Sequence, residues 1–267
     1  MLLSILSELS GAILAVVIVA IIIGSAVGLL EVFASTANFI VLFKNRRMRR
    51  VDITNGQTVS SAVRIFLDSN GMSDVKIEQA GFWRGIVFGN HYNIKKNVFF
   101  VRKRQMNSAR LSYVTDSVQR AAKAMNYREG DKKTKKIIRF QNYIAFMPYF
   151  VIPLILVGVV LDALLFHFQN YAMLTLIFLI LGLAFFIFSA VLMFMTIKVE
   201  KAANDRALEI MINSNFLTDE EITKVKSIFK WRIISYIANF ILALIRIVQY
   251  ILRIIGWILK GLGKAKK

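Results

Sequence analysis

The stretch Gln119-Arg120-Ala121-Ala122-Lys123 brings together side chains that could act on one bound ion. On an α-helix, the first and last of these residues lie on one face, one turn apart. Two imidazoles at that spacing bind a metal ion, and a carboxylate beside the first takes a proton from metal-bound water. Here an amide is a poor zinc ligand, an ammonium repels a dication, and a guanidinium cannot act as a base near neutral pH. The stretch therefore predicts no metal-dependent catalysis.

A helix expected over 107–126 must carry these residues. Its apolar positions, from Leu111 to Met125, recur with the 3.6-residue period of one helix face. Gln119 and Lys123 fall on a neighbouring face. We therefore expect them at the edge of a packed helix, next to whichever element covers its apolar side.

The segment before this helix is expected to contain a helix, a strand and a hairpin. Thr58 can cap a helix that ends near Asn70. The alternation of residues in 75–78 favours a strand, and the runs 83–88 and 97–102 flank a turn-rich stretch. These two runs are predicted to be the strands of the hairpin.

Composition indicates an integral membrane protein, because 57% of the 267 residues are hydrophobic and two are proline. The apolar stretches 11–43, 143–166 and 171–197 are each as long as the roughly 20 residues that a helix needs to cross a bilayer core of about 30 Å. A cleaved signal peptide is the alternative for the first stretch. However, 1–10 has no basic residue and the apolar run is too long. We interpret 1–43 as a retained transmembrane anchor and 143–197 as a transmembrane hairpin.

The basic residues orient these spans. Neither 1–43 nor 143–197 contains Lys or Arg, so all 35 basic residues lie in 44–142 and 198–267. By the positive-inside rule, these two regions face the cytoplasm, and the N-terminus and the turn 167–170 face outside. We expect a multi-pass cell-membrane protein whose main domain, 44–142, is cytoplasmic and carries 22 basic against 7 acidic residues. The region 198–230 is expected to form further cytoplasmic helices, and Thr218-Asp-Glu-Glu221 predicts that one of them begins with a capping box.

The last region, 231–267, predicts an apolar helix with a narrow polar stripe and a basic tail. Polar residues recur every seven positions, at Arg232, Asn239, Arg246, Arg253 and Lys260. Spanning the bilayer would put two arginines at depth, at about 2.5–3.5 kcal/mol each, and the terminal lysines outside. We therefore favour an amphipathic helix in the cytoplasmic interface. A fourth span whose stripe faces the bundle is the alternative.

Anionic lipid is the partner that the positions of the basic residues favour. The residues expected to face lipid are Lys44, Arg46, Arg47, Arg49 and Arg50, directly after the first span, and Arg246 and Arg253 in the last helix. Nucleic acid is disfavoured, because Phe82-Trp83 and its neighbourhood lack a recognisable RNA-binding aromatic pattern.

Five local patterns lie in order between the predicted spans. They are Ile65-Phe-Leu-Asp-Ser-Asn-Gly71, Val75-Lys-Ile-Glu78, Asn90-His-Tyr-Asn93, Val199-Glu-x-x-Ala-x-x-Arg-Ala-Leu208 and Phe216-Leu-Thr-Asp-Glu-Glu221. Together they resemble the integral-membrane neutral zinc metallopeptidases of the YugP-like group, over roughly 35–256. The resemblance implies a membrane α-helical protein with a small α+β cytoplasmic domain of zincin-like, minimal gluzincin type.

In that family, the helix before the second span carries the zinc-binding signature His-Glu-x-x-His. Ala124-Met125-Asn126 and Glu129-Gly130 fix the register, which puts Gln119 and Lys123 at the histidine positions and Arg120 at the glutamate. Glu200 matches the position of the family's third ligand. The resemblance therefore implies a degenerate site with no catalytic residue, metal or cofactor. Glu200 is expected either to be a relic ligand or to form an ion pair with Lys123 or Arg120.

Other polar residues have plainer interpretations. His91 is expected near the cleft, in a structural or groove role, whereas His167 lies in the external turn, across the bilayer. Glu31 and Asp162 are expected at membrane boundaries. No cysteine is present, so disulfides and thiolate metal sites are excluded.

Three functions follow from this sequence. We favour a non-catalytic relative of the metallopeptidases that binds a polypeptide, a membrane protein or anionic lipid at the cytoplasmic membrane face. An active zinc metallopeptidase with atypical ligands is the first alternative. A basic membrane tether for anionic lipid or nucleic acid is the second.

Overall fold

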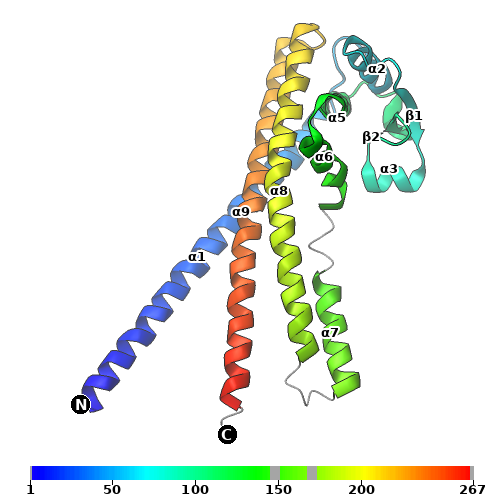
Figure 1. The fold of residues 1–267 in the computed structure, drawn as a ribbon. Helices are drawn as coiled ribbons and strands as arrows, with labels where there is room; N and C mark the ends of the chain where they lie inside the picture. The colour runs from blue at the N-terminus through cyan, green and yellow to red at the C-terminus, as the bar shows by residue number, and fades with distance from the viewer. Residues whose placement is uncertain (1, 145–150, 167–172, 265–267) are drawn as a thin grey trace.

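A computed structural model of the protein describes residues 2–144, 151–166 and 173–264, and over these residues the fold is mostly helical, with one small sheet. Figure 1 shows a compact part, residues 51–144, beside one end of a group of long helices. We call this part the head. The elements in chain order are α1 (Leu2–Met48), α2 (Val59–Ser69), β1 (Lys76–Ala80), α3 (Phe82–Phe88), β2 (His91–Asn93), β3 (Val98–Arg102), α4 (Lys103–Met106), α5 (Leu111–Glu129), α6 (Lys132–Ile144), α7 (Val151–Phe166), α8 (Met173–Asn213) and α9 (Asp219–Lys264).

Three helices within the described residues are long and apolar enough to cross a membrane. The qualifying segments are Gly24–Met48 of α1, Leu174–Asn213 of α8 and Asp219–Ile245 of α9. The helix α7 packs against the first half of α8, so that the two form a helical hairpin. The turn 167–170, with His167, lies outside the described residues.

The helix α9 does not have the arrangement favoured for an interfacial helix. It is one continuous helix that packs along both α1 and α8 and runs toward the end of the bundle where α1 begins (Figure 1). The polar stripe explains this packing. Asn38 of α1 receives hydrogen bonds from Ser235 and, at 3.3 Å, from Asn239. The described part of the stripe, from Arg232 to Asn239, therefore faces the bundle, as in the alternative of a fourth span, because polar groups in an apolar environment need hydrogen-bond partners.

The sheet has the order β1-β3-β2, with β1 parallel and β2 antiparallel to β3. The prediction that 83–88 forms a hairpin strand is wrong, because this run is the helix α3. The hairpin is formed instead by β2 and β3, with His91 opposite Phe100. Aromatic and β-branched residues favour strands only weakly, and tertiary context overrides that preference. Here α3 is the crossover between the parallel strands β1 and β3.

The predicted caps of α2 and α9 are confirmed. Thr58 accepts a hydrogen bond from the amide of Ser61 at the start of α2. At the start of α9, the Thr218 amide donates a hydrogen bond to the Glu221 carboxylate at 2.9 Å. The Glu221 amide in turn donates one to the Thr218 hydroxyl at 3.4 Å. Glu221 also accepts the Thr54 amide at 2.8 Å. The capping box therefore also fixes the chain after α1 to the start of α9.

The core of the head draws on distant parts of the sequence. Phe66 of α2 packs in one apolar cluster with Met125 of α5, Met211 of α8 and Ile228 of α9, each almost fully buried. Phe66 also makes an edge-to-face contact with Phe216. The region 44–142 therefore does not form a complete hydrophobic core by itself, because side chains of α8 and α9 make up part of that core.

Asp162 joins α7 to the start of α8. Its carboxylate accepts the backbone amide of Leu174 at 3.0 Å and the amide and hydroxyl of Thr175. These amides lie in the first turn of α8, where no intrahelical carbonyl can accept them. Asp162, which we expected only to mark a membrane boundary, thus serves as a helix cap supplied by the neighbouring helix.

Replacing Asp162 with Ala should lower the stability of the α7–α8 hairpin by about 2 kcal/mol, because it strips the first turn of α8 of its acceptor and of a favourable negative charge. Thermal unfolding in detergent measures the effect. Asp205→Ala, at an exposed position of the same helix, is the matched control and should change stability by less than about 0.5 kcal/mol. Equal melting temperatures for the two variants would contradict the capping role.

Candidate functional site

The helix α5 turns its central polar residues toward α8. Its apolar residues from Leu111 to Met125 are buried in the head core. Gln119 is buried too, beside them and on the side where α5 contacts α8. The helix is predicted over 107–126 and observed at 111–129. A separate short helix, α4, and the residues that follow it take the place of its first turn.

Glu200 of α8 is the centre of the site. Its Oε2 accepts a hydrogen bond from Gln119 Nε2 at 2.7 Å, and its Oε1 forms an ion pair with the Lys123 ammonium. The side chains of Lys123 and Glu200 are only 17% and 8% exposed. The structure therefore contains the ion pair between Glu200 and Lys123 that was one of the two expectations for Glu200.

The electrostatics follow from this burial. Removal from water lowers the pKa of Lys123 below its usual value of 10.5, Glu200 opposes that change, and the nearby Arg120 guanidinium adds to it. A buried charge is tolerated where a partner and hydrogen bonds compensate for lost hydration. Glu200 thus favours the charged form of Lys123.

A polar cavity of about 250 Å³ opens beside the pair. Its lining comes from α1, α5, α8 and α9, and includes Asp116, Arg120, Asn204 and Arg232 as well as the pair. The charged groups of the lining are thus three cations and two carboxylates. The Asn204 Oδ1 is buried and lacks a hydrogen-bond partner among the described residues.

Arg232 is a site residue whose role the sequence reasoning missed. It forms an ion pair with Asp116 of α5 and donates to Asn45 Oδ1 of α1 at 3.1 Å. The polar stripe, whose residues recur every seven positions, was the sequence signal for this residue, since the stripe begins at Arg232. However, only the packing of α9 against α1 and α5 places Arg232 in the cavity. Arg232 therefore ties three helices together at the site.

Arg120 and His91 both lie close to Phe88, the last residue of α3. Arg120 lines the cavity and donates toward the Phe88 carbonyl at the end of α3, at 3.5 Å. His91, expected near the cleft, stacks on Phe100 and hydrogen-bonds through Nδ1 with the Gly89 carbonyl at 3.0 Å. His91 is not part of the cavity lining. Its contacts agree with a structural role.

The donor set does not suit a zinc ion. Zinc needs three or four imidazole, thiolate or carboxylate ligands. In the cavity it would meet two carboxylates that are each paired with a cation, three amides, an ammonium and two guanidinium groups. Among the described residues, no three His, Asp or Glu side chains lie close enough to hold a metal.

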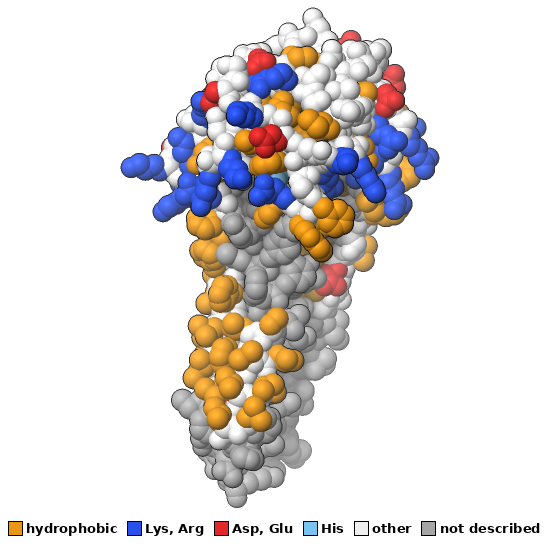
Figure 2. Space-filling view, turned by 90° about the vertical axis from the view of Figure 1, so that its right-hand side faces the viewer, with side chains coloured by type: hydrophobic (Ala, Val, Ile, Leu, Met, Phe, Trp, Pro, Cys, Tyr) orange, Lys and Arg blue, Asp and Glu red, His pale blue; other side chains and the backbone are white. Residues whose placement is uncertain are grey.

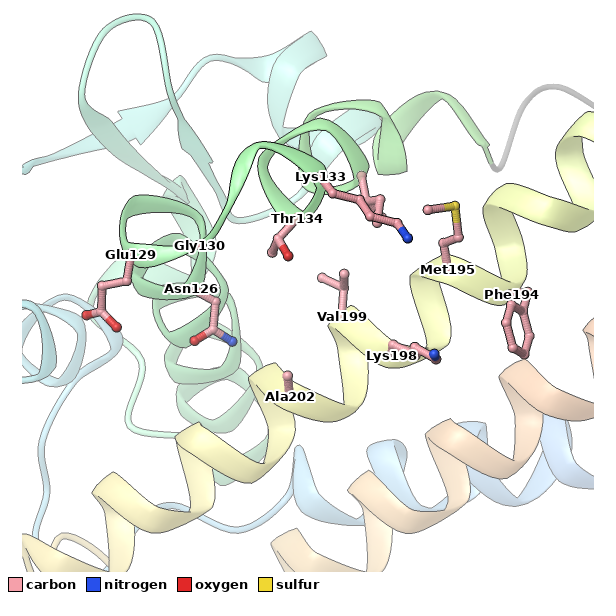
Figure 3. A pocket seen from close by; sticks show the side chains of 11 residues that line it. Asn126, Glu129, Gly130, Lys133, Thr134, Phe194, Met195, Lys198, Val199 and Ala202 are labelled. Atoms are coloured by element: carbon pink, nitrogen blue, oxygen red, sulfur yellow. The ribbon is translucent and has the colours of Figure 1, made fainter.

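A second hollow, of about 590 Å³, lies between α6 and α8. Figure 3 shows Lys133 of α6 and Lys198 of α8 in it, beside the apolar side chains of Phe194 and Met195. Its one carboxylate, Glu129, is bound by Arg206 at 2.6 Å and 2.8 Å. The hollow therefore joins cationic and apolar groups where the apolar part of α8 ends.

The residues expected to face lipid divide into two groups. Lys44, Arg46, Arg47, Arg49 and Arg50 lie at the end of α1 and just after it, next to the head. Lys44 donates to Ser227 of α9 at 2.9 Å, and the Arg49 guanidinium lies 5.6 Å from the centre of the Tyr113 ring. The side chains of Arg246 and Arg253 lie outside the described residues.

Comparisons with known proteins identify relatives of the chain. Residues 13–255 match a family described as "Putative neutral zinc metallopeptidase". The chain is 22% identical, over 224 residues, to "Putative membrane protease YugP" of Bacillus subtilis (strain 168); the match covers 81% of this chain and 89% of the relative. No solved structure matches the chain.

Lys123→Met should lower the free energy of unfolding by about 3 kcal/mol, because it leaves the buried Glu200 carboxylate without its ammonium partner. The double variant Lys123→Met/Glu200→Gln removes both charges, keeps an acceptor for Gln119, and should recover most of that loss. Denaturant titration in detergent measures the wild type, Lys123→Met, Glu200→Gln and the double variant. If the double variant is as unstable as the sum of its two single variants, the side chains do not form a compensating pair.

Mild acid should destabilise the head through His91. Burial lowers the pKa of His91 below its usual 6.5, with smaller contributions from Arg120 and Arg84, while the hydrogen bond to Gly89 opposes the shift. Neutral His91 therefore contributes stability that is full above pH 6.5 and is lost as pH falls through the folded pKa. The melting temperature of wild type should fall more steeply with acid than that of His91→Phe. Parallel curves would contradict this role.

Proposed function

The chain belongs to the neutral zinc metallopeptidase family, and from this premise we propose that it is a member without the catalytic metal. In this proposal it is a non-catalytic binding protein at the cytoplasmic face of the cell membrane. It keeps a zincin-like head and uses that head to hold a polypeptide or membrane-protein partner rather than to cleave it.

The observation that carries the proposal is that Lys123 and Gln119 already bind the two carboxylate oxygens of Glu200. In the family, the corresponding glutamate completes a metal site formed with two histidines and a catalytic glutamate on the helix that aligns with α5. Here Lys123 supplies a tethered positive charge to that carboxylate, and Gln119 binds its second oxygen. A zinc ion would have to displace an ammonium group and then share the cavity with Arg120 and Arg232. Coulomb repulsion in such a poorly hydrated site opposes this exchange.

The residue at the position of the family's proton acceptor also does not suit peptide hydrolysis. A metal-bound water must lose a proton to a carboxylate on the same helix. The residue at that position, Arg120, keeps its proton at neutral pH. We therefore assign no catalytic step to the cavity.

The shape of the head supports a binding role. Strand β2 pairs with β3 along one edge and has no strand partner on its other edge within the described part of the chain. Strand β2 also contacts α5. An extended polypeptide can add to such an edge through main-chain hydrogen bonds, and it would then pass beside α5. Asn90, next to β2, already donates to Ser117 of α5 at 2.7 Å, which fixes strand and helix relative to each other.

The basic residues support the membrane placement. The charged end of α1 and the hollow with Lys133 and Lys198 both lie next to the apolar part of a candidate span. Clusters of Lys and Arg at that depth favour the anionic cytoplasmic leaflet. Anionic lipid is therefore the first partner that we propose, and the N-terminus is placed outside.

Zinc content tests the loss of the metal site. Wild-type protein purified in zinc-containing buffer should hold less than about 0.1 zinc per chain by elemental analysis, since its donors exclude the ion. The triple variant Gln119→His/Arg120→Glu/Lys123→His restores two imidazoles beside Glu200 and should bind about one zinc per chain.

Gln119→His alone is the matched control, because it adds one ligand and keeps both cations, and it should remain zinc-free. Wild type that binds stoichiometric zinc, or hydrolyses casein in a chelator-sensitive way, would establish the alternative of an enzyme with atypical ligands. A triple variant that folds and still binds no zinc would show that α5 and α8 do not frame the family's metal site.

A further inference from the structure

The helix α3 exposes an apolar face that no other described residue of the chain covers. Phe82, Trp83 and Ile86 are 73%, 76% and 57% exposed, and the two aromatic rings pack edge-to-face, 5.4 Å apart. Exposed aromatic residues gathered on one short helix mark a surface that is covered in use.

The opposite side of α3 is firmly held. Arg102 of β3 donates through Nε to the Gly85 carbonyl at 2.6 Å, and the Arg84 guanidinium lies 4.7 Å from the centre of the Phe100 ring. The three apolar side chains are therefore kept outside by contacts on the other face, and α3 cannot turn them inward without losing these contacts.

The height of α3 along the bundle indicates what covers it. Figure 1 shows α3 and α6 at the same level. The helix α6 packs against α8, the hollow between them is lined by α8 residues from Phe194 to Ala202, and the apolar part of α8 ends there, at Lys198. In Figure 1 α3 lies along the underside of the head, on the side toward which the apolar length of α8 extends. It thus lies at the level where hydrocarbon gives way to headgroups if α8 crosses the bilayer.

Charge around the patch agrees with this position. A hollow of about 960 Å³ beside α3 is lined by Phe82 and Ile86 together with basic side chains and no acidic one. The basic residues are Arg49, Arg102, Lys103 and Arg104. Figure 2 shows apolar side chains at the lower rim of the head among Lys and Arg side chains, directly above the long helices, which together form the stalk of the molecule. An apolar centre within a basic ring matches the boundary of an anionic bilayer, where acyl chains lie beneath phosphates.

We propose that α3 is a second membrane contact of this protein. Phe82, Trp83 and Ile86 insert into the boundary between headgroups and acyl chains of the bilayer that α8 crosses, and Lys103 and Arg104 bind anionic headgroups. The contact holds the head against the membrane. Because Arg120 donates to the last residue of α3, the membrane contact of α3 also holds the cavity beside Glu200 close to the lipid surface. The proposal rests on the crossing of α8 and is independent of the loss of the metal.

The tryptophans make the depth measurable. In the full chain with Trp231→Phe and Trp257→Phe, Trp83 is the single emitter. One copy is reconstituted per nanodisc of phosphatidylglycerol and phosphatidylcholine, with and without bromine on the acyl chains. Trp83 should emit at shorter wavelength than in water, should be quenched by the brominated lipid, and should be protected from aqueous iodide by at least about twofold relative to an exposed tryptophan.

The exposed reference comes from the same chain. Ile65→Trp, on α2, combined with Trp83→Phe in that background, places the emitter at a half-exposed position of the head. It should be quenched by iodide and not by bromine. Trp83 that behaves like this reference in nanodiscs overturns the proposal. Shielding of Trp83 that appears only when discs are concentrated assigns the patch to protein association and overturns it equally.

The contribution of the basic ring is tested separately. Lys103→Gln/Arg104→Gln should reduce bromine quenching of Trp83 by about twofold in discs with phosphatidylglycerol and leave it unchanged in discs of phosphatidylcholine alone. Both lysine and arginine are exposed, so this pair of changes leaves the core of the head intact. An equal effect in the two lipids would refute the electrostatic part of the proposal.

Discussion

The buried carboxylate of Glu200 must be neutralised, and the arrangement of α5 against α8 follows from that requirement. An ionised carboxylate away from water is stable only with a positive partner and hydrogen bonds. Lys123 and Gln119, one helical turn apart, provide both. In a zinc peptidase, a metal ion meets the same requirement. Here a side chain does so, because the Lys123 ammonium is paired with Glu200 where α5 packs against α8.

Polar pairs between helices recur through the long part of the molecule. Arg232 of α9 reaches Asp116 of α5 and Asn45 of α1, and Ser235 reaches Asn38 one turn further along. At the far end of the hairpin, Asp162 caps α8 from α7. Apolar helices in lipid gain little from hydrophobic contact with one another, so such pairs determine which helices lie together. The same pairs bring residues from four helices to the walls of the cavity.

The head combines a small sheet with short helices, of which α5 and α6 pack against α8. Its core uses residues of α8 and α9, so the head cannot move independently of the bundle. The short helix α3, with its apolar side outward, and the lysines of the hollow between α6 and α8 lie on the side of the head toward the stalk. A head fixed in this way presents the edge of β2 and the cavity near the membrane surface.

The sequence by itself determined the long apolar helices, the basic character of the head, the caps at Thr58 and Thr218, and the loss of metal-binding residue types at Gln119, Arg120 and Lys123. These features depend on composition and on short-range spacing, which the chain carries locally. The tertiary structure alone decided that 83–88 is a helix, that Glu200 takes Lys123 as its partner, and that Arg232 faces α1 and α5. Each of these depends on contacts between residues far apart in the sequence, whose energies outweigh local preferences and cannot be read from either partner alone.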